Sequence, residues 1–299
     1  MIDNVLATAT LLTTPILLTA IGGLINRLGG IVNIGLEAMM LAGAYIALVV
    51  SSATQSWPLA LLAALTLGAA IGLLFSLVVT RLDANEIVAG VGFDIATAGL
   101  IGFILKDYYH SSGTIRLPNV LMLPRIPLGP LDQVPIVGAV LANKDPLTWL
   151  SWILVPVTAF VLSRTRVGLR LRAAGAAPEA AVALGMRPLA IRDASTVVAG
   201  ALAGLAGAQL SIGIVGVFSV GMSGGRAFIA LAAFYFGRNR PGLTAVGAGL
   251  FGLFDAIQIY LQGRGVPPEL VQMLPYVVVL VVLTSLGVAD RKRRLTQGG

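Results

Sequence analysis

Apolar stretches long enough to cross a lipid bilayer recur along nearly the whole chain, and they restrict the possible folds severely. An α-helix needs about 20 apolar residues to span the hydrocarbon, whereas a membrane β-strand needs about 10 residues that alternate between apolar and polar. The stretches here are continuous, and charged residues make up only 11% of the chain. The sequence therefore predicts an all-α, polytopic membrane protein, with residues 1–299 forming a single transmembrane domain.

The apolar pattern predicts about nine transmembrane helices, of which one or two are broken or re-entrant. Residues Arg27–Gly30 interrupt the first apolar region so briefly that the second helix is expected to begin within the membrane. The run 219–237 leaves only Ala227–Gly237 as uninterrupted apolar helix, which is too short to span a bilayer. The predicted spans are 5–26, 34–54, 57–80, 87–105, 147–163, 194–216, 219–237, 243–262 and 270–288.

Positive charges gather in short segments between the spans, where they orient a membrane protein. The segments predicted to be cytoplasmic are Arg81, the loop 164–193, Arg238 with Arg240, and the tail 291–294. Counting nine spans back from a cytoplasmic C-terminus places the N-terminus and the loop 106–146 outside. Around its apolar residues 136–141, this loop is expected to form either a lid or interfacial segment, or an irregular surface loop. The net charge of +7 is thus an orientation signal and indicates no nucleic-acid partner.

The segment Arg164–Asp193 combines strong positive charge with the signals of a short helix. Six arginines surround an alanine-rich core. Pro178 and Glu179 suit the first helical turn, because proline's missing N–H is no loss there and a carboxylate meets the positive end of the helix dipole. Gly185 suits the end of the helix. Because a loop that only connects spans needs no such helix, we expect a partner to dock there.

Three sets of residues carry a resemblance to a known family. They are, first, Thr14–Leu18, Gly29–Glu37 and Met40–Ala44; second, Gly224–Ala233 with Phe236–Arg238 and Pro241; and third, Arg172, Gly175, Pro178, Ala180, Ala181 and Gly185. These sets resemble the permease subunits of bacterial ABC importers for nucleosides, within the wider group that includes ribose and branched-chain amino acid permeases. The chain departs from the family pattern at Ala38, where the family has glycine, and at Ala176-Ala177, where it has Glu-Asn.

The resemblance implies a type II importer fold in a bacterial inner membrane and the transport of nucleosides. The alternative substrates are simple sugars such as ribose, or branched-chain amino acids. It also implies three protein partners: a cytoplasmic ATPase, a second permease subunit that is a different chain, and an extracytoplasmic substrate-binding protein. The chain has no G-x-x-x-x-G-K-[ST] phosphate loop, so ATP would be bound by the partner ATPase and the chain needs no cofactor of its own.

The helix Pro178–Leu184 is the element predicted to dock on the ATPase, with Ala180, Ala181, Val182 and Leu184 as its packing residues. The arginines around it would hold it at the membrane through lipid phosphates, or would pair with acidic residues of the partner. The predicted coupling residues are Arg172, Gly175, Pro178, Glu179, Ala180, Ala181, Leu184 and Gly185.

Polar and aromatic side chains within the spans are candidates for lining the substrate path, because an ionisable group in hydrocarbon is costly unless it meets a cavity or a partner. The candidates are Asn33, Glu37, Asp94, Arg226, Phe228, Asp255 and Gln258. Each also has a structural alternative. Asn33 would cap a helix, Glu37 would pair with Arg27 or backbone amides, and Arg226 would pair with a loop acid. Asp94, Asp255, Gln258 and Gln209 would bond between helices, and Phe228, like Phe234, Tyr235 and Phe236, would serve packing.

An enzyme is the alternative from a different functional class, and the sequence argues against it. A catalytic or metal site needs several His, Asp or Glu side chains at one depth, whereas the one histidine, His110, falls in an outer loop and the acids are scattered. We therefore predict no catalytic residues and no metal. A secondary transporter that needs no ATP is a less favoured alternative. The chain has no cysteine for disulfide or thiol chemistry, and the absence of Lys and Arg before Arg27 predicts no cleavable signal peptide.

Overall fold

A computed structural model describes residues 2–127, 140 and 142–262, together with the single positions 273, 277 and 284. Over these residues the fold is helical, apart from one two-residue strand pair, which confirms the predicted all-α class. The elements are α1 (Ile2–Leu28), α2 (Leu36–Thr54), α3 (Trp57–Arg81), α4 (Glu86–Asp107), β1 (Thr114–Ile115), α6 (Pro146–Arg164), α7 (Arg166–Ala176), α8 (Pro178–Ala183), α9 (Pro188–Ala208), the π-helical turn η2 (Gln209–Val215), β2 (Phe218–Ser219), α10 (Arg226–Phe236) and α11 (Pro241–Gln262).

Seven helices of the described part are long and apolar enough to cross a membrane, with α9 and η2 counted as one. They correspond to the predicted spans, with ends that differ by a few residues. The two predicted interruptions are present: α2 begins only after a non-helical segment at 29–35, and the run 219–237 is helical only in the 11 residues of α10. The ninth predicted span, 270–288, falls outside the described residues except at three positions, as do the tail 291–294 and the apolar loop residues 136–141 except Val140.

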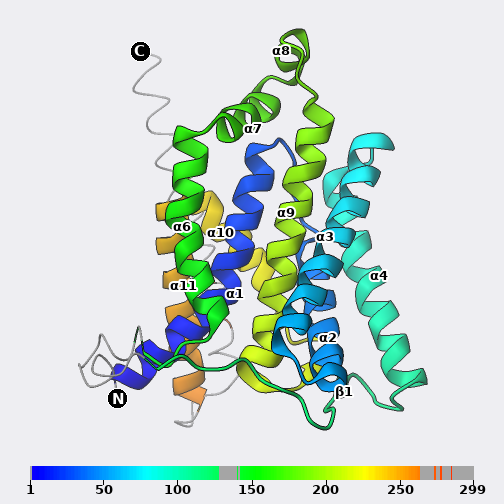
Figure 1. The fold of residues 1–299 in the computed structure, drawn as a ribbon, viewed down its shortest axis with the longest axis vertical. Coiled ribbons are helices and arrows are strands. Elements are labelled where there is room, and N and C mark those ends of the chain that lie inside the picture. The colour runs from blue at the N-terminus through cyan, green and yellow to red at the C-terminus, as the bar shows by residue number, and fades with distance from the viewer. Residues whose placement is uncertain are drawn as a thin grey trace.

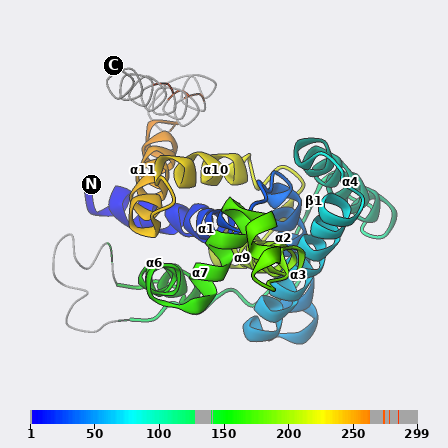
Figure 2. The same ribbon diagram turned by 90° about the horizontal axis from the view of Figure 1, so that it is seen from above.

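Helix α9 runs through the centre of the bundle and packs against α1, α2 and α3 (Figure 1). Helices α6 and α11 lie at one side, and α4 lies at the opposite edge, where it contacts α2 and α3 (Figures 1 and 2). Helices α7 and α8 lie at one end of the molecule, whereas the N-terminus and β1 lie at the other. The chain therefore places the helices α7 and α8 and the β1–β2 strand pair at opposite ends.

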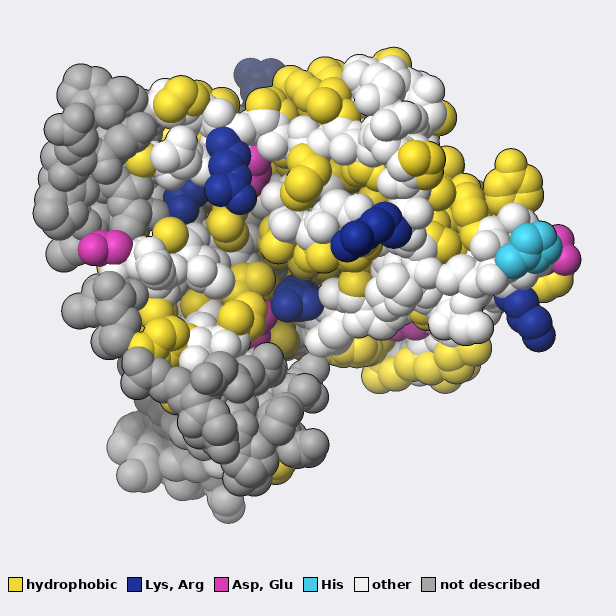
Figure 3. Space-filling model, turned by 90° about the horizontal axis from the view of Figure 1, so that it is seen from below, with side chains coloured by type: hydrophobic (Ala, Val, Ile, Leu, Met, Phe, Trp, Pro, Cys, Tyr) yellow, Lys and Arg dark blue, Asp and Glu magenta, His cyan; other side chains and the backbone are white. Residues whose placement is uncertain are grey.

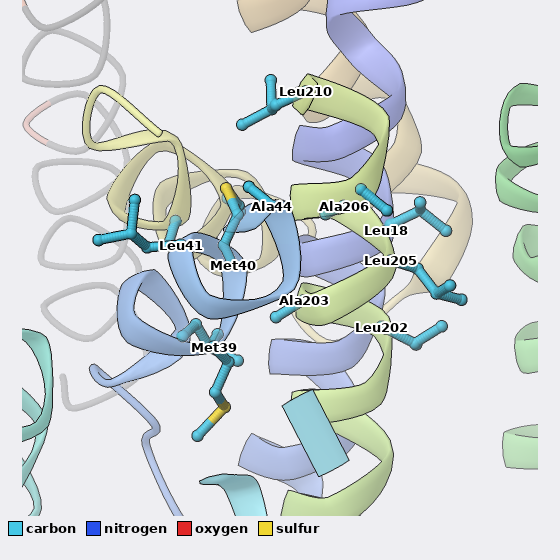
Figure 4. Close-up of a cluster of buried hydrophobic side chains, with 14 of the residues drawn as sticks. Leu18, Met39, Met40, Leu41, Ala44, Leu202, Ala203, Leu205, Ala206 and Leu210 are labelled. Carbon is cyan, nitrogen blue, oxygen red and sulfur yellow. The ribbon is translucent and has the colours of Figure 1, made fainter. Parts of the chain in front are cut away.

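Small residues let the central helices approach to backbone contact. Helix α9 faces α3 through Gly200 and Gly204, and a Cβ atom added at Gly72 of α3 would lie 2.6 Å from the carbonyl oxygen of Thr196. On the side of α9 toward α2, the buried Ala203 and Ala206 take part in a cluster with Met40 and Ala44, shown in Figure 4. Close approach of this kind replaces the hydrophobic effect as a source of helix association in lipid, because lipid tails are as apolar as the side chains.

Local signals explain where several helices begin. The side chain of Asp145 accepts a hydrogen bond from the Thr148 amide at the start of α6, and Pro146 occupies the first helical position. Asn85 caps α4 in the same way by accepting from the amides of Ile87 and Val88. Side-chain oxygens at these positions satisfy amides that have no partner within the helix.

We expect Gly204→Ala to destabilise the protein, because the new methyl group would run into the backbone of Ala64 in α3. The expected loss is about 1–3 kcal/mol, the usual range for overpacking. Gly102→Ala is the matched control, since Gly102 lies in a helix with nothing within 4 Å of an added Cβ. The midpoint of thermal unfolding in detergent should fall for Gly204→Ala and stay level or rise for Gly102→Ala; equal midpoints would contradict the packing described.

Candidate functional site

The segment Arg164–Asp193 folds into two helices and the start of a third. The predicted short helix is present as α8, with Pro178 at its first position and Leu184 at its end. Helix α7 was not predicted, because its arginines were assigned to a basic loop. Its signals are nevertheless in the sequence: Thr165 caps the helix through Gly168, and the small or apolar residues Gly168, Leu171 and Ala174 form a buried stripe at helical spacing.

Helix α7 is anchored to the end of α1 through glycine. A Cβ atom at Gly175 would collide with the backbone of Leu28 and lie 2.9 Å from the amide nitrogen of Gly30. The side chain of Arg192, from α9, lies against the same glycine, Gly30. Of the predicted coupling residues, Gly175 therefore packs against the membrane-spanning body, while Arg172 is exposed on α7 and bonds within it to the Gly168 carbonyl.

Helix α8 carries an exposed apolar surface at the tip of the molecule. Val182 and Leu184 are 60% and 79% exposed, and Glu179 and Ala180 are exposed as well. Ala181 is 1% exposed, so it faces inward and not toward a partner. Gly185 ends the helix in the left-handed region, with φ of 74°. An exposed apolar tip on a helix with a defined start and end is suited to insert into a groove of another protein.

A second group of candidate residues lies where helices are interrupted within the bundle. Three carboxylates accept hydrogen bonds from backbone amides that have no helical partner. Glu37 accepts from the amides of Gly225 and Ala227 at the start of α10, with both distances 3.0 Å. Asp94 of α4 accepts from the amide of Ala38 at the start of α2 at 2.8 Å. Negative charge is favoured at each of these helix starts.

Glu86 is the third of these carboxylates, and the sequence did not single it out. It accepts from the amide of Val32 at 2.8 Å, within the segment that separates α1 from α2. The predicted cap by Asn33 is not formed: the cap position of α2 is Gly35, and Asn33 donates instead to the sulfur of Met39. The alternative in which Glu37 meets backbone amides is the one present, although the amides belong to α10; Arg27 lies over the ring of Tyr235 instead.

Arg226 and Asp255 form an ion pair between α10 and α11. The nitrogen–oxygen distance is 3.5 Å, and their side chains are 21% and 9% exposed. Arg226 also donates to the carbonyls of Met222 and Ser223, which lie in the turn before α10. The partner of Arg226 is thus an acid within a predicted span, rather than the loop acid of the structural alternative. Together with Glu37, the pair fixes the start of a short helix inside the bundle.

The remaining candidates are placed differently. Phe228 is 46% exposed on α10, and Gln258 is half-buried on α11. Gln209 is fully buried and donates to Asp145 at 2.8 Å, as expected of an interhelical hydrogen bond. Asp145 also bonds to Thr148, whose hydroxyl lies 3.0 Å from that of Thr14.

This network at the start of α6 was missed, although Asp followed by Pro is a recognisable helix start. It joins α1, α6 and η2, and the neighbouring Lys144 is buried as well and donates to the carbonyl of Ala7. Burial lowers the pKa of the Lys144 ammonium, against the attraction of Asp145. The network therefore holds together the end of the bundle opposite α8.

Figure 3 shows that opposite end, where charged side chains are few and scattered among hydrophobic ones. The one histidine, His110, is exposed there at an edge of the view. Among the described residues, no three His, Cys, Asp or Glu side chains form a cluster able to hold a metal ion. The arginines of α7 and of its flanking turns all lie at the end that carries α8. The asymmetry of charge seen in the sequence is thus an asymmetry between two ends of the fold.

Comparisons with known proteins agree on one family. The family model described as "Branched-chain amino acid transport system / permease component" matches residues 5–283. The nucleoside ABC transporter permease protein NupC of Lactococcus lactis is 33% identical, with 93% of this chain and 90% of that protein covered. The guanosine ABC transporter permease protein NupQ of Bacillus subtilis is 31% identical, with 96% and 93% covered. The putative glucose ABC transporter permease protein TsgC13 of Haloferax volcanii is 29% identical, with 94% and 91% covered. No solved structure matches.

We expect Arg226→Met to destabilise the protein strongly, because it leaves the carboxylate of Asp255 buried without its cation. Breaking one side of a buried pair costs about 3–5 kcal/mol, whereas replacing both partners with apolar residues is close to neutral. The double variant Arg226→Met with Asp255→Leu should therefore recover most of the loss. Thermal unfolding midpoints of the three proteins in detergent test this, and a double variant no more stable than Arg226→Met would argue against the pair.

Proposed function

Because the chain belongs to the family of branched-chain amino acid transport system permease components, and so is a transport subunit rather than an enzyme, we propose that it imports nucleosides. The observation that supports nucleosides as the substrate is the similarity, over more than nine-tenths of the chain, to a nucleoside permease and a guanosine permease. The putative glucose permease TsgC13 of Haloferax volcanii is similar over 94% of the chain, so a simple sugar is the second candidate.

In this proposal ATP hydrolysis takes place in a separate cytoplasmic ATPase that binds α8. Support comes from the exposed apolar tip of α8, formed by Val182 and Leu184, and from the arginines on both sides of it. Pro178 and Gly185 define the helix, Arg172 and Glu179 provide charge beside it, and Gly175 fixes α7 to the body. Ala180 belongs to the docking face, whereas Ala181 supports α8 from within. The arginines also meet the phosphates of an anionic membrane surface.

The remaining partners follow from the same proposal. A second permease subunit, which is a different chain, completes the pathway in a bacterial inner membrane. An extracytoplasmic binding protein delivers the substrate to the end that carries the N-terminus and the loop 106–146. The α8 end and the C-terminus are then cytoplasmic, which agrees with the positive charge on α7 and its flanking turns.

Within the membrane, the candidate path residues have two kinds of role in this proposal. Glu37, Asp94, Arg226 and Asp255 shape the path indirectly, because each holds a helix end or a short helix in position. Phe228 and Gln258 are the candidates for touching the substrate, since an amide can bond a sugar hydroxyl or base edge and a partly exposed ring can stack on a base. Asn33 is only 2% exposed, so it lies behind the surface that a substrate would meet.

We expect Val182→Asp with Leu184→Asp to abolish binding of the ATPase, because two carboxylates would have to be buried in an apolar groove. The fold should be unaffected, since both side chains are exposed. Leu82→Asp is the matched control, because Leu82 is 74% exposed in the turn between α3 and α4 at the same end of the bundle. Co-purification of the ATPase with the tagged permease measures the effect, and retention of the ATPase by the double variant would rule out docking through α8.

The substrate is tested with the complete complex in liposomes. Chain, sister permease, ATPase and binding protein are reconstituted with ATP inside or outside, and uptake of radiolabelled guanosine, ribose, glucose and leucine is compared. We expect guanosine uptake that requires both ATP and the binding protein. Uptake of glucose in preference to guanosine would favour the sugar alternative, and uptake by the chain without an ATPase would indicate a secondary transporter.

A further inference from the structure

Asp193, on the second turn of α9, accepts three hydrogen bonds from α3. One carboxylate oxygen accepts from the hydroxyl of Ser76 at 2.7 Å and from that of Thr80 at 3.2 Å. The other oxygen accepts from Arg81 at 2.8 Å, which is also an ion pair. The Asp193 side chain is 15% exposed. A charged acceptor with three donors on one neighbouring helix is a strong local connection, because hydrogen bonds to an ionised group are shorter and stronger than neutral ones.

This connection lies on α9, the helix that follows α8 in the chain and contacts it. Only the four residues 184–187 separate α8 from α9. Farther along the same two helices, α3 and α9 are in backbone contact: Gly68 faces Gly200, and Gly204 faces Ala64. Helices packed through glycine backbones have little freedom to slide, because a shift brings bulkier residues into the contact. The α3–α9 pair is therefore stiff through the bundle, and Asp193 fixes its end next to α8.

The rest of the contact between α8 and the bundle is slight. Among the described elements, helix α8 has appreciable contact with α7 and α9 alone, and Ala181 is its one buried residue. Helix α7 in turn rests on the end of α1 through Gly175. The position of α8 is thus set by two anchors, Gly175 on one side and Asp193 on the other. Packing against α1 provides the first anchor, and a polar cluster provides the second.

We propose that Asp193 is a positioning residue for energy coupling: it holds α9 to α3 beside α8, so that a displacement of α8 by the ATPase moves α3 and α9 together. This inference rests on the proposed function, because it takes α8 to be the site where the ATPase binds. Without the cluster, α8 would still dock, but its displacement would be absorbed by bending at the start of α9.

The functional test uses the reconstituted complex and the variants Asp193→Asn and Asp193→Ala. Asparagine keeps an oxygen for Ser76 and Thr80 but loses the charge that pairs with Arg81, whereas alanine loses all three bonds. The control is Asp83→Asn, because Asp83 is an exposed acid two residues beyond Arg81 with φ of 53°, a conformation that asparagine also tolerates.

We expect all three variants to co-purify the ATPase at the level of the unaltered chain and to show similar basal ATP hydrolysis. Guanosine taken up per ATP hydrolysed should fall by roughly two- to thirty-fold for Asp193→Ala, the range in which residues remote from both ligands alter coupling, with Asp193→Asn between it and the control. Arg81→Lys, which keeps the charge, should retain more coupling than Arg81→Gln. Unchanged uptake per ATP in Asp193→Ala would overturn the proposal, as would loss of both folding and ATPase binding in every Asp193 variant.

A second measurement separates this proposal from the proposed function. Because the chain has no cysteine, spin labels can be placed at two introduced cysteines, Leu82→Cys and Ala183→Cys, in the chain alone in nanodiscs. The distribution of distances between the labels should be narrow in the parent and broader with Asp193→Ala, but unchanged with Asp83→Asn. An equally narrow distribution with Asp193→Ala would refute the positioning role. Absence of guanosine uptake by the unaltered complex would refute the proposed substrate, whereas the distance measurement would still test the positioning role of Asp193.

Discussion

The whole fold depends on satisfying the backbone of interrupted helices inside a medium without water. An unpaired amide in hydrocarbon costs several kcal/mol, so a chain that breaks a helix at membrane depth must supply a partner for each freed amide. Backbone carbonyls serve some of these amides, and carboxylates serve four others. Glu86 serves the segment between α1 and α2, Asp94 serves the start of α2, and Glu37 serves the start of α10. The carboxylates are in turn stabilised, because each meets the positive end of a helix or a free amide.

These contacts also explain why the acids of the spans are not gathered at one place. Each carboxylate and the amides bonded to it belong to different parts of the bundle. Glu86 and Asp94 join α4 to the start of α2 and the segment before it, and Glu37 joins α2 to α10. The ion pair between Arg226 and Asp255 adds the link from α10 to α11. The short helix α10, which cannot span a bilayer, is therefore fixed by its ion pair and by its hydrogen bonds to Glu37. An interrupted bundle of this kind can be rearranged without exposing a long hydrophobic surface, which suits a protein whose family moves solutes.

The sequence predicted the spans well because the thickness of a bilayer imposes a length on every helix that crosses it, and hydrophobic runs report that length directly. It also predicted both interruptions. Gly29-Gly30 separate two apolar runs by too few residues for an ordinary loop, and the glycines before Arg226 leave an apolar run too short to span a bilayer. Helix α8 followed from Pro178 and Gly185. The partners of Glu37, Asp94 and Arg226 did not follow, because each lies 29 to 190 residues away and is set by how the helices pack. Helix α7 was missed because its buried stripe is short and its many arginines resemble an orientation signal.

The two candidate sites, the coupling segment and the path residues, meet at one point, the break between α1 and α2. Gly30 lies in that break and contacts both Gly175 of α7 and the side chain of Arg192 of α9. The same break leads into α2, whose first turn carries Glu37, the residue that holds the start of α10. In the proposed mechanism, a displacement of α7 and α8 would therefore reach the bundle at a non-helical segment, residues 29–35. Uninterrupted helices at this place would transmit such a displacement only by moving as whole rods, whereas a break lets α2 and α10 respond separately from α1.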